Sequence, residues 1–151
     1  MSLREQLNED LKTAMRAKDQ ARLVVIRGIK AAILAAETRS ERITLDDDGI
    51  LQVIAKELKE RRDALPDFER SGRQDLVDKL HHEMELLSQY LPAPLTSDEL
   101  RILVNEAVQS VGATGPKDMG KVMAWLAPKT RGRADGRDVS ALVKEQLALL
   151  V

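Results

Sequence analysis

Apolar residues recur at spacings of three and four along most of this 151-residue chain, and that spacing constrains the fold more than any other feature of the sequence. Leu3, Leu7, Leu11 and Met15, for example, lie at intervals of four, which places them on one stripe of a helix. No alternating stretch of useful length competes with this pattern, and only three residues are aromatic. The sequence therefore predicts an all-α fold with an aliphatic core.

Capping residues and helix stops divide these stripes into seven predicted helices. Ser2 with Glu5, and Thr96 with Glu99, form the capping-box pattern, in which side chains satisfy the first backbone amides of a helix. The first predicted helix covers residues 3–17, and the second runs from Asp19 to a polar connection at 39–46. The third runs from that connection to Ser71-Gly72, and the fourth covers about 73–90. The fifth runs from Thr96 to Gly112, the sixth covers 116–127, and the seventh begins at Asp135.

Two prolines and one glycine interrupt these helices. Pro66 lies inside the third predicted helix, where the missing backbone amide predicts a kink or a short break, and Pro128 is predicted to end the sixth. Gly28, inside the second helix, costs about 1 kcal/mol relative to alanine, so we expect another helix to approach closely there.

The segment Leu-Pro-Ala-Pro-Leu at 91–95 cannot continue a helix, because its two prolines lack amide donors and restrict the residues before them. It predicts a boundary between an N-terminal domain at 1–91 and a C-terminal domain at 96–151, with a linker at 92–95.

Positive charge is concentrated between residues 117 and 137. This window has six cations and two acids, a net charge of +4 in a chain whose formal net charge is −1. Lysine and arginine neutralise phosphates, and the glycines at 132 and 136 would let a sugar–phosphate chain approach the backbone. The alternative is a solvated loop whose cations only keep the domain soluble. The candidate RNA-binding residues are Lys117, Lys121, Lys129, Arg131, Arg133 and Arg137.

Two neighbours of these cations have competing interpretations. Trp125 could stack on an exposed base, but its position on the apolar stripe with Met119 and Met123 favours packing in the domain. Asp135 suits a helix cap better than a catalytic acid. Recognition of backbone shape is therefore favoured over base stacking.

Other polar clusters give weaker functional signals. His81 and His82, with Glu83 and Glu85, suggest a metal site, but adjacent helical residues point about 100° apart and no further histidine is present, so a surface pair is favoured. Residues 56–63 mix both charges at helical spacings, as a salt-bridged helix face does; a second cationic surface is the alternative. Phosphate-loop, nucleophile-elbow and Cys/His motifs are absent, so no catalytic residue, metal or cofactor is predicted.

The bulk sequence also bears on location. The chain has no cysteine, its N-terminus lacks the apolar stretch of a secretory signal, and no run approaches the roughly 18 apolar residues of a membrane span. These features predict a cytoplasmic protein without a membrane partner.

Five ordered phrases resemble a known family. They are Lys-Glu-Leu-Lys-Glu-Arg-Arg-Asp (56–63), Ser-Gly-Arg-Gln-Asp-Leu (71–76), Tyr-Leu-Pro (90–92), Asp-Met-Gly-Lys-Val-Met (118–123) and Gly-Arg-Ala-Asp-Gly-Arg (132–137). With them the chain resembles the YqeY family nearly end to end. The stretch from Gly120 onward also resembles the tail domain of GatB, the B subunit of the aspartyl/glutamyl-tRNA amidotransferase. The resemblance implies a four-helix N-terminal unit and a three-helix C-terminal unit of the GatB-tail type.

Three functional hypotheses follow. The first is a non-catalytic protein that binds tRNA or another structured RNA through the six cations, since the resemblance associates the GatB tail with holding tRNA. The second is an accessory component of a glutamine-dependent carbon–nitrogen ligase, in which glutamine hydrolysis and amido transfer occur on amidotransferase subunits and not on this chain. The third is an adaptor that binds another protein through the N-terminal helices.

Overall fold

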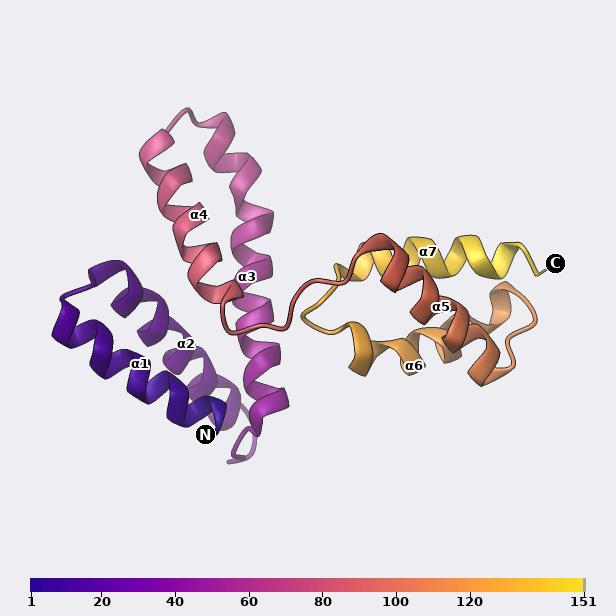
Figure 1. Cartoon of the computed structure of the whole chain (residues 1–151), viewed down its shortest axis with the longest axis horizontal. Helices are drawn as coiled ribbons and strands as arrows, with labels where there is room; N and C mark the ends of the chain where they lie inside the picture. Colours follow the sequence, from indigo (N-terminus) through magenta and orange to yellow (C-terminus); the bar gives the residue numbers. More distant parts are fainter. Residues whose placement is uncertain (151) are drawn as a thin grey trace. The chain divides into compact units, whose positions relative to one another are not determined.

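The computed structural model describes residues 1–150, and within that range the regular structure is entirely helical (Figure 1). The all-α prediction is confirmed. None of the described helices is both long and apolar enough to cross a membrane. The elements in chain order are α1 (Leu3–Ala17), α2 (Gln20–Thr38), α3 (Asp47–Arg70), α4 (Gln74–Ser88), α5 (Ser97–Val111), the 3₁₀ turn η1 (Pro116–Asp118), α6 (Met119–Thr130) and α7 (Gly136–Ala148).

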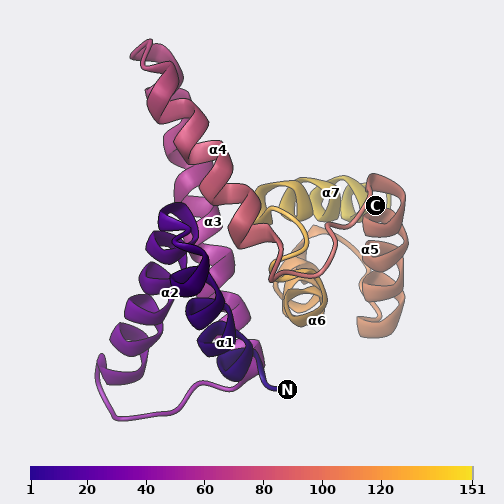
Figure 2. The same ribbon diagram turned by 60° about the vertical axis from the view of Figure 1, so that its left-hand side comes forward.

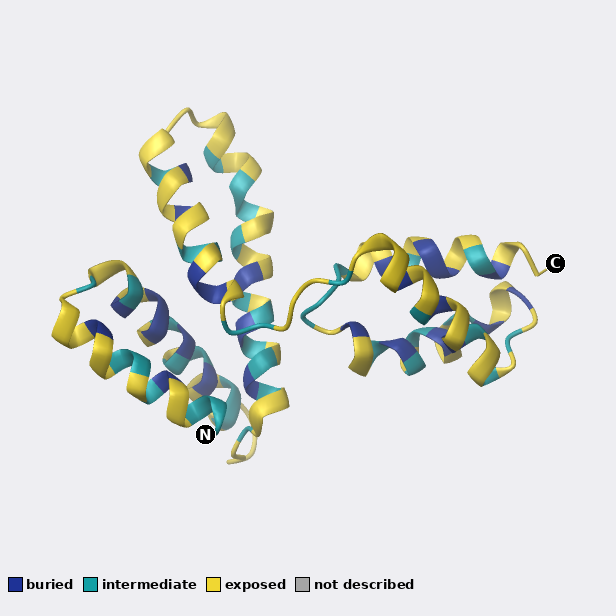
Figure 3. Ribbon diagram, viewed as in Figure 1, coloured by how far each residue is buried: buried dark blue, intermediate teal, exposed yellow. Residues whose placement is uncertain are grey.

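The chain forms two compact units, each with its own core. Unit 1 runs from Met1 to Leu91 and contains α1 to α4, while unit 2 begins at Pro92 and contains α5 to α7 with η1. Buried residues follow the inward faces of the helices in each unit (Figure 3).

Unit 1 buries aliphatic side chains from all four of its helices. α3 and α4 form a helical hairpin that turns at Gly72, whose φ of 73° is in the left-handed region that glycine favours, and α1 pairs with α2 (Figure 2). A small cluster of Ala14, Leu23 and Ile26 joins α1 to α2. The main cluster consists of Leu7, Val25, Ile29, Ile33, Ile50, Ile54, Leu58, Leu86 and Leu87.

Unit 2 has a second aliphatic core. Trp125, Met119 and Met123 are partly buried and pack against it, so the packing interpretation of Trp125 is confirmed. Full burial of one aliphatic side chain contributes about 1.5–3 kcal/mol, which is why the inward stripes decide how these short helices pack. The buried residues are Leu100, Val104, Ala107, Val122, Leu126, Val139, Leu142, Val143 and Leu147.

Several helices begin where their capping residues predict. At α1 the Ser2 hydroxyl accepts the Glu5 amide at 3.1 Å and the Glu5 carboxylate accepts the Ser2 amide at 3.3 Å, which completes the capping box. The side chains of Asp19, Thr96 and Asp135 accept first-turn amides of α2, α5 and α7. Each such cap contributes about 1 kcal/mol to its helix.

The proline predictions need correction. Pro128 does not end α6, because the helical bonding passes it: the Arg131 amide donates to the Ala127 carbonyl at 3.1 Å, and the Thr130 hydroxyl to the Leu126 carbonyl at 3.1 Å. Pro66 does not break α3 either, since the helix continues to Arg70, while the alternative of a kink stays a prediction. Both prolines are exposed, so neither ring displaces a core side chain, and each removes only one backbone donor.

Three predictions about packing are also wrong. A methyl group built on Gly28 would meet no atom within 4 Å, so no other helix approaches closely there. Met15 is exposed because a four-residue step turns a helix by about 400°, and three such steps after Leu3 add about 120° of drift. Leu150, which the apolar stripe of the last predicted helix places inward with Val139, Leu142 and Val143, is exposed because it lies beyond the end of α7, while Leu147 takes the inward position.

Candidate nucleic-acid interface

The structure places the six candidate cations in two groups, at opposite ends of α6. This helix has 12 residues, so its ends lie about 18 Å apart at a rise of 1.5 Å per residue. The basic window is therefore not one continuous loop. We call residues 129–137 the α6–α7 turn. Lys117 and Lys121 lie in η1 and the first turn of α6, whereas Lys129, Arg131, Arg133 and Arg137 lie in the α6–α7 turn.

The group at the start of α6 surrounds the buried carboxylate of Asp118. This carboxylate accepts the Thr114 amide at 2.8 Å and the Thr114 hydroxyl at 3.3 Å, and the Lys121 Nζ lies 3.9 Å from it. The bond from the Thr114 amide lowers the pKa of Asp118 most, and the charges of Lys121 and Lys117 lower it further. Asp118 is thus an anion that offsets the two lysines beside it.

The α6–α7 turn is closed by backbone hydrogen bonds to one carbonyl. The amides of Arg133 and Ala134 donate to the Thr130 carbonyl at 2.9 and 3.0 Å. Gly132 adopts a φ of 74°, a left-handed conformation that costs a residue with a side chain about 1–2 kcal/mol. The turn therefore has a defined backbone that presents its side chains from fixed positions.

Arg133 connects this turn to the linker segment. Its Nε donates to the Ala93 carbonyl at 3.0 Å, and its own carbonyl accepts the Leu95 amide at 2.8 Å. A guanidinium has five N–H donors, so one bond to a carbonyl leaves donors for an anion. Sequence reasoning missed this connection, because no local pattern relates residue 133 to a partner 40 positions earlier.

The other cations of the turn differ in their surroundings. The Lys129 Nζ lies 4.0 Å from the centroid of the Trp125 ring, a cation–π contact. Arg131 is exposed. Arg137 is exposed and its Nη2 lies 3.6 Å from Asp135 Oδ2, while Asp135 Oδ1 accepts the Arg137 amide at 2.8 Å.

Asp135 is the one acid among residues 129–137, and it is occupied as the cap of α7. The turn thus offers charged donors on an ordered backbone, a combination that suits binding of phosphate groups.

The remaining sequence candidates are structural in character. His81 and His82 are both exposed, and within residues 1–150 no three His, Asp or Glu side chains are grouped so that they could hold a metal ion. The cluster at 56–63 is a salt-bridged helix face, as favoured from the sequence. Arg61 is its centre: Nη1 lies 2.9 Å from Glu57 Oε2, and Nε lies 3.1 Å from Glu83 Oε2, which ties α3 to α4.

Comparison with known proteins gives a consistent result. The chain matches the family described as "Yqey-like protein" over residues 4–147. It is similar to "Altered inheritance of mitochondria protein 41, mitochondrial" of Lachancea thermotolerans, with 30% identity over 93% of this chain and 78% of that protein. The protein of the same name from Eremothecium gossypii is 37% identical over 94% of this chain and 79% of its own length. The one from Pyrenophora tritici-repentis is 32% identical over 92% and 77%.

These names contradict the predicted cytoplasmic location, since each of these relatives is named as mitochondrial. The prediction was wrong because the absence of an apolar leader bears only on secretion. Mitochondrial targeting segments are amphipathic and arginine-rich, and the sequence argument did not address them. The resemblance to YqeY, by contrast, is confirmed: a match over residues 4–147 shows that the chain belongs to the YqeY family.

Proposed function

We propose that this protein binds tRNA or another structured RNA through the α6–α7 turn, without catalysing a reaction itself. The observation that carries the proposal is the charge of residues 129–137, which hold four cations and one acid, and that acid both caps α7 and pairs with Arg137. Contacts from lysine and arginine to phosphates supply much of the affinity of proteins for nucleic acids.

The geometry of the turn supports binding to a backbone and not only to a small anion. Arg133 is held by the Ala93 carbonyl, and the turn is closed on the Thr130 carbonyl, so part of the site is ordered before RNA arrives. A site that is ordered in advance loses less conformational freedom on binding. Four cations within nine residues can contact more than one phosphate, which a nucleic-acid strand supplies and a single small anion does not.

The resemblance of residues from Gly120 onward to the GatB tail supports tRNA among structured RNAs. The same resemblance motivates the accessory-component hypothesis, in which the chain acts beside amidotransferase subunits on aminoacyl-tRNA. The two hypotheses differ in their dependence on the turn. Co-purification with amidotransferase subunits that persists after the turn is changed would favour the accessory component over free RNA binding.

The test is a titration of the full chain with purified bulk tRNA, followed by fluorescence anisotropy at one low salt concentration. The variant Lys129→Glu/Arg131→Glu reverses two charges in the turn. The matched control Arg101→Glu/Lys144→Glu reverses two exposed charges on α5 and α7 of the same unit. Circular dichroism and Trp125 fluorescence check that both variants fold.

We expect the turn variant to bind tRNA at least tenfold more weakly than the unchanged protein, which corresponds to about 1.4 kcal/mol. The control is expected to lose less, because only non-specific attraction changes. Equal affinity of the turn variant and the unchanged protein, or equal losses in the two variants, would remove the turn from the binding site.

A further inference from the structure

α2 presents an apolar face that unit 1 leaves uncovered. Solvent-exposed helix faces are ordinarily rich in charged and polar residues. On this side of α2, however, only one of the eight exposed residues is charged. Val24 and Leu34 are 54% and 61% exposed, which is unusual for branched aliphatic side chains in a protein that has a core available. At 100° per residue the members share one side of the helix, and they are Gln20, Ala21, Val24, Arg27, Ala31, Leu34, Ala35 and Thr38.

The central part of this face is apolar and has no side chain at one position, Gly28. Gly28 lies within it, between the exposed Val24 and Ala31, and a Cβ at Gly28 would meet no atom within 4 Å. Nothing packed within unit 1 therefore requires a glycine at this position, although glycine weakens the interior of a helix by about 1 kcal/mol. A partner helix could approach closely here, with Val24 and Leu34 filling grooves on its surface.

Cations lie beside this face, whereas the one acid of α2 already has partners. The one acid of α2 is Glu37, whose Oε2 accepts Arg4 Nη2 at 2.6 Å and the Leu45 amide at 2.8 Å. The bond from the Leu45 amide lowers the pKa of Glu37 most, and Arg4 lowers it further, so this carboxylate stays ionised and occupied. Arg27 is then the charged group on the face itself.

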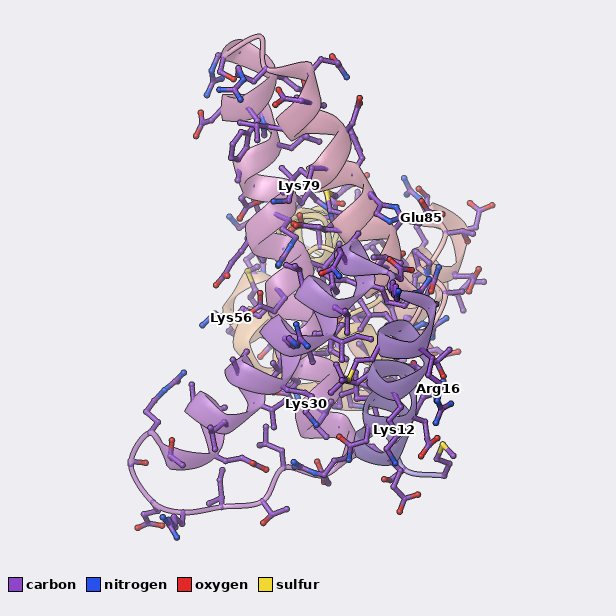
Figure 4. All side chains as sticks on the ribbon, turned by 90° about the vertical axis from the view of Figure 1, so that its left-hand side faces the viewer. Lys12, Arg16, Lys30, Lys56, Lys79 and Glu85 are labelled. Carbon is purple, nitrogen blue, oxygen red and sulfur yellow. The ribbon has the colours of Figure 1, made fainter. Side chains whose placement is uncertain are left out.

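Further cations come from all four helices of unit 1. Figure 4, in which α1 and α2 face the viewer, labels Lys12 and Arg16 of α1, Lys30 of α2, Lys56 of α3 and Lys79 of α4, together with one acid, Glu85. Lys30 donates to Asn8, a neutral partner. The four helices contribute these residues to one side of the unit in this view. Lys12 pairs with Glu9, with 3.5 Å between Nζ and Oε1, and the four remaining labelled cations outnumber the labelled acid.

We infer that unit 1 docks an amphipathic helix of another protein along α2, with the apolar side of that helix on Val24 and Leu34 and its acidic residues toward Arg27 and the cations of Figure 4. Charge complementarity selects this occupant. α2 has 19 residues, which is about 28 Å, so it accommodates a partner helix of up to about five turns.

Other occupants fit the same surface less well. A second copy of the chain would bring Arg27 and its neighbouring cations against the same cations, which is unfavourable at close range. A helix that lies on a lipid surface ordinarily carries several Trp, Phe or Leu anchors, whereas this face holds one leucine, Leu34, with Val24, alanines and no aromatic residue. RNA would meet the cations but gain nothing from the apolar part. The inference concerns unit 1 and does not depend on RNA binding by unit 2.

The test uses synthetic helical peptides of about 18 residues and the full chain, with binding followed by fluorescence anisotropy. One set of peptides carries Leu and Ala on one face with Glu along its flanks, and a matched set carries Lys in place of each Glu. The variant Val24→Ser/Leu34→Ser removes the two large side chains from the α2 face. The matched control Ile102→Ser/Leu149→Ser removes two comparably exposed apolar side chains from unit 2.

The acidic peptides should bind at least tenfold more tightly than the lysine peptides, and Val24→Ser/Leu34→Ser should weaken that binding about tenfold, or about 1.4 kcal/mol. The unit 2 control should leave it unchanged. The inference is overturned if no acidic peptide binds, if both peptide sets bind equally, or if the two double variants behave alike. It is also overturned if sedimentation shows a dimer that Val24→Ser/Leu34→Ser dissolves, or if vesicles containing phosphatidylserine bind the face in place of the peptide.

Discussion

Unit 1 and unit 2 differ in what their cations contact. Unit 1 has 16 lysines and arginines and 18 acids, and cations such as Arg4 and Arg61 bind acids on other elements of the same unit. Unit 2 has eight cations and seven acids, and four of the eight cations lie in the α6–α7 turn, where the lone acid, Asp135, caps a helix and pairs with one of them, Arg137. In each unit the number of cations is close to the number of acids. The positions of the acids therefore decide whether a cation stabilises the fold or faces a ligand.

The first prediction tests whether the two units have independent cores. Ile54 in unit 1 and Leu126 in unit 2 are both 0% exposed, and replacing either with alanine should cost about 2–5 kcal/mol of unfolding free energy. Leu126→Ala should shift the urea transition seen by Trp125 fluorescence, and Ile54→Ala the one seen by Tyr90. Equal shifts of both signals in both variants would show one cooperative unit and break the comparison.

The next prediction concerns the cations of unit 1. Arg61→Ala should destabilise unit 1 by about 1–3 kcal/mol, less than the 3–5 kcal/mol of a fully buried pair, because Arg61 and Glu83 are 20% and 14% exposed. Lys59→Ala is the control, since Lys59 and its partner Asp63 are largely exposed, and should cost at most about 1 kcal/mol. Urea unfolding measures both. Equal costs would mean that burial does not distinguish these pairs.

A smaller effect of opposite sign is expected at Gly28. Gly28→Ala should raise the unfolding free energy of unit 1 by about 0.5–1 kcal/mol, because alanine favours the helix interior and its methyl group meets no other atom. Thermal unfolding measures the change. Gly112→Ala, at a φ of 64°, should instead lower the stability of unit 2. A loss of stability at Gly28→Ala would reveal an intramolecular contact at this position.

The smallest effect is expected in the α6–α7 turn. Arg131→Ala should change the unfolding free energy of unit 2 by no more than about 0.5 kcal/mol, as for other exposed surface residues. This variant is the counterpart of Arg61→Ala under the same urea conditions. A cost above 1 kcal/mol would show that Arg131 belongs to the fold, and the contrast between the units would disappear.

Local chemistry made most of the fold predictable. Ser2, Asp19, Thr96 and Asp135 mark helix starts because a cap acts on amides only two or three residues away. α4 lacks such a signal, since Arg73 at its start makes no side-chain cap bond. Proline effects were overestimated, because their cost depends on whether the surrounding helix still gains burial and hydrogen bonds.

The candidate site was less predictable, because it depends on distances between elements. The basic window is continuous in sequence, but α6 turned out to separate Lys117 and Lys121 from the other four cations. The bond from Arg133 to Ala93 joins residues 40 positions apart. The exposed face of α2 was hidden for the same reason: the sequence shows a helix that is apolar on more than one side, and only packing reveals which side is buried.

The most direct test of the central claim, that the α6–α7 turn contacts RNA phosphates, is the salt dependence of tRNA affinity. If Lys129, Arg131, Arg133 and Arg137 engage, the logarithm of the association constant should fall with the logarithm of salt concentration at a slope of about −2.8 to −3.6, at roughly 0.7–0.9 per phosphate. Lys129→Gln/Arg131→Gln should reduce the magnitude of this slope by about 1.5. A slope near zero for the unchanged protein, or the same slope for both proteins, would contradict the account.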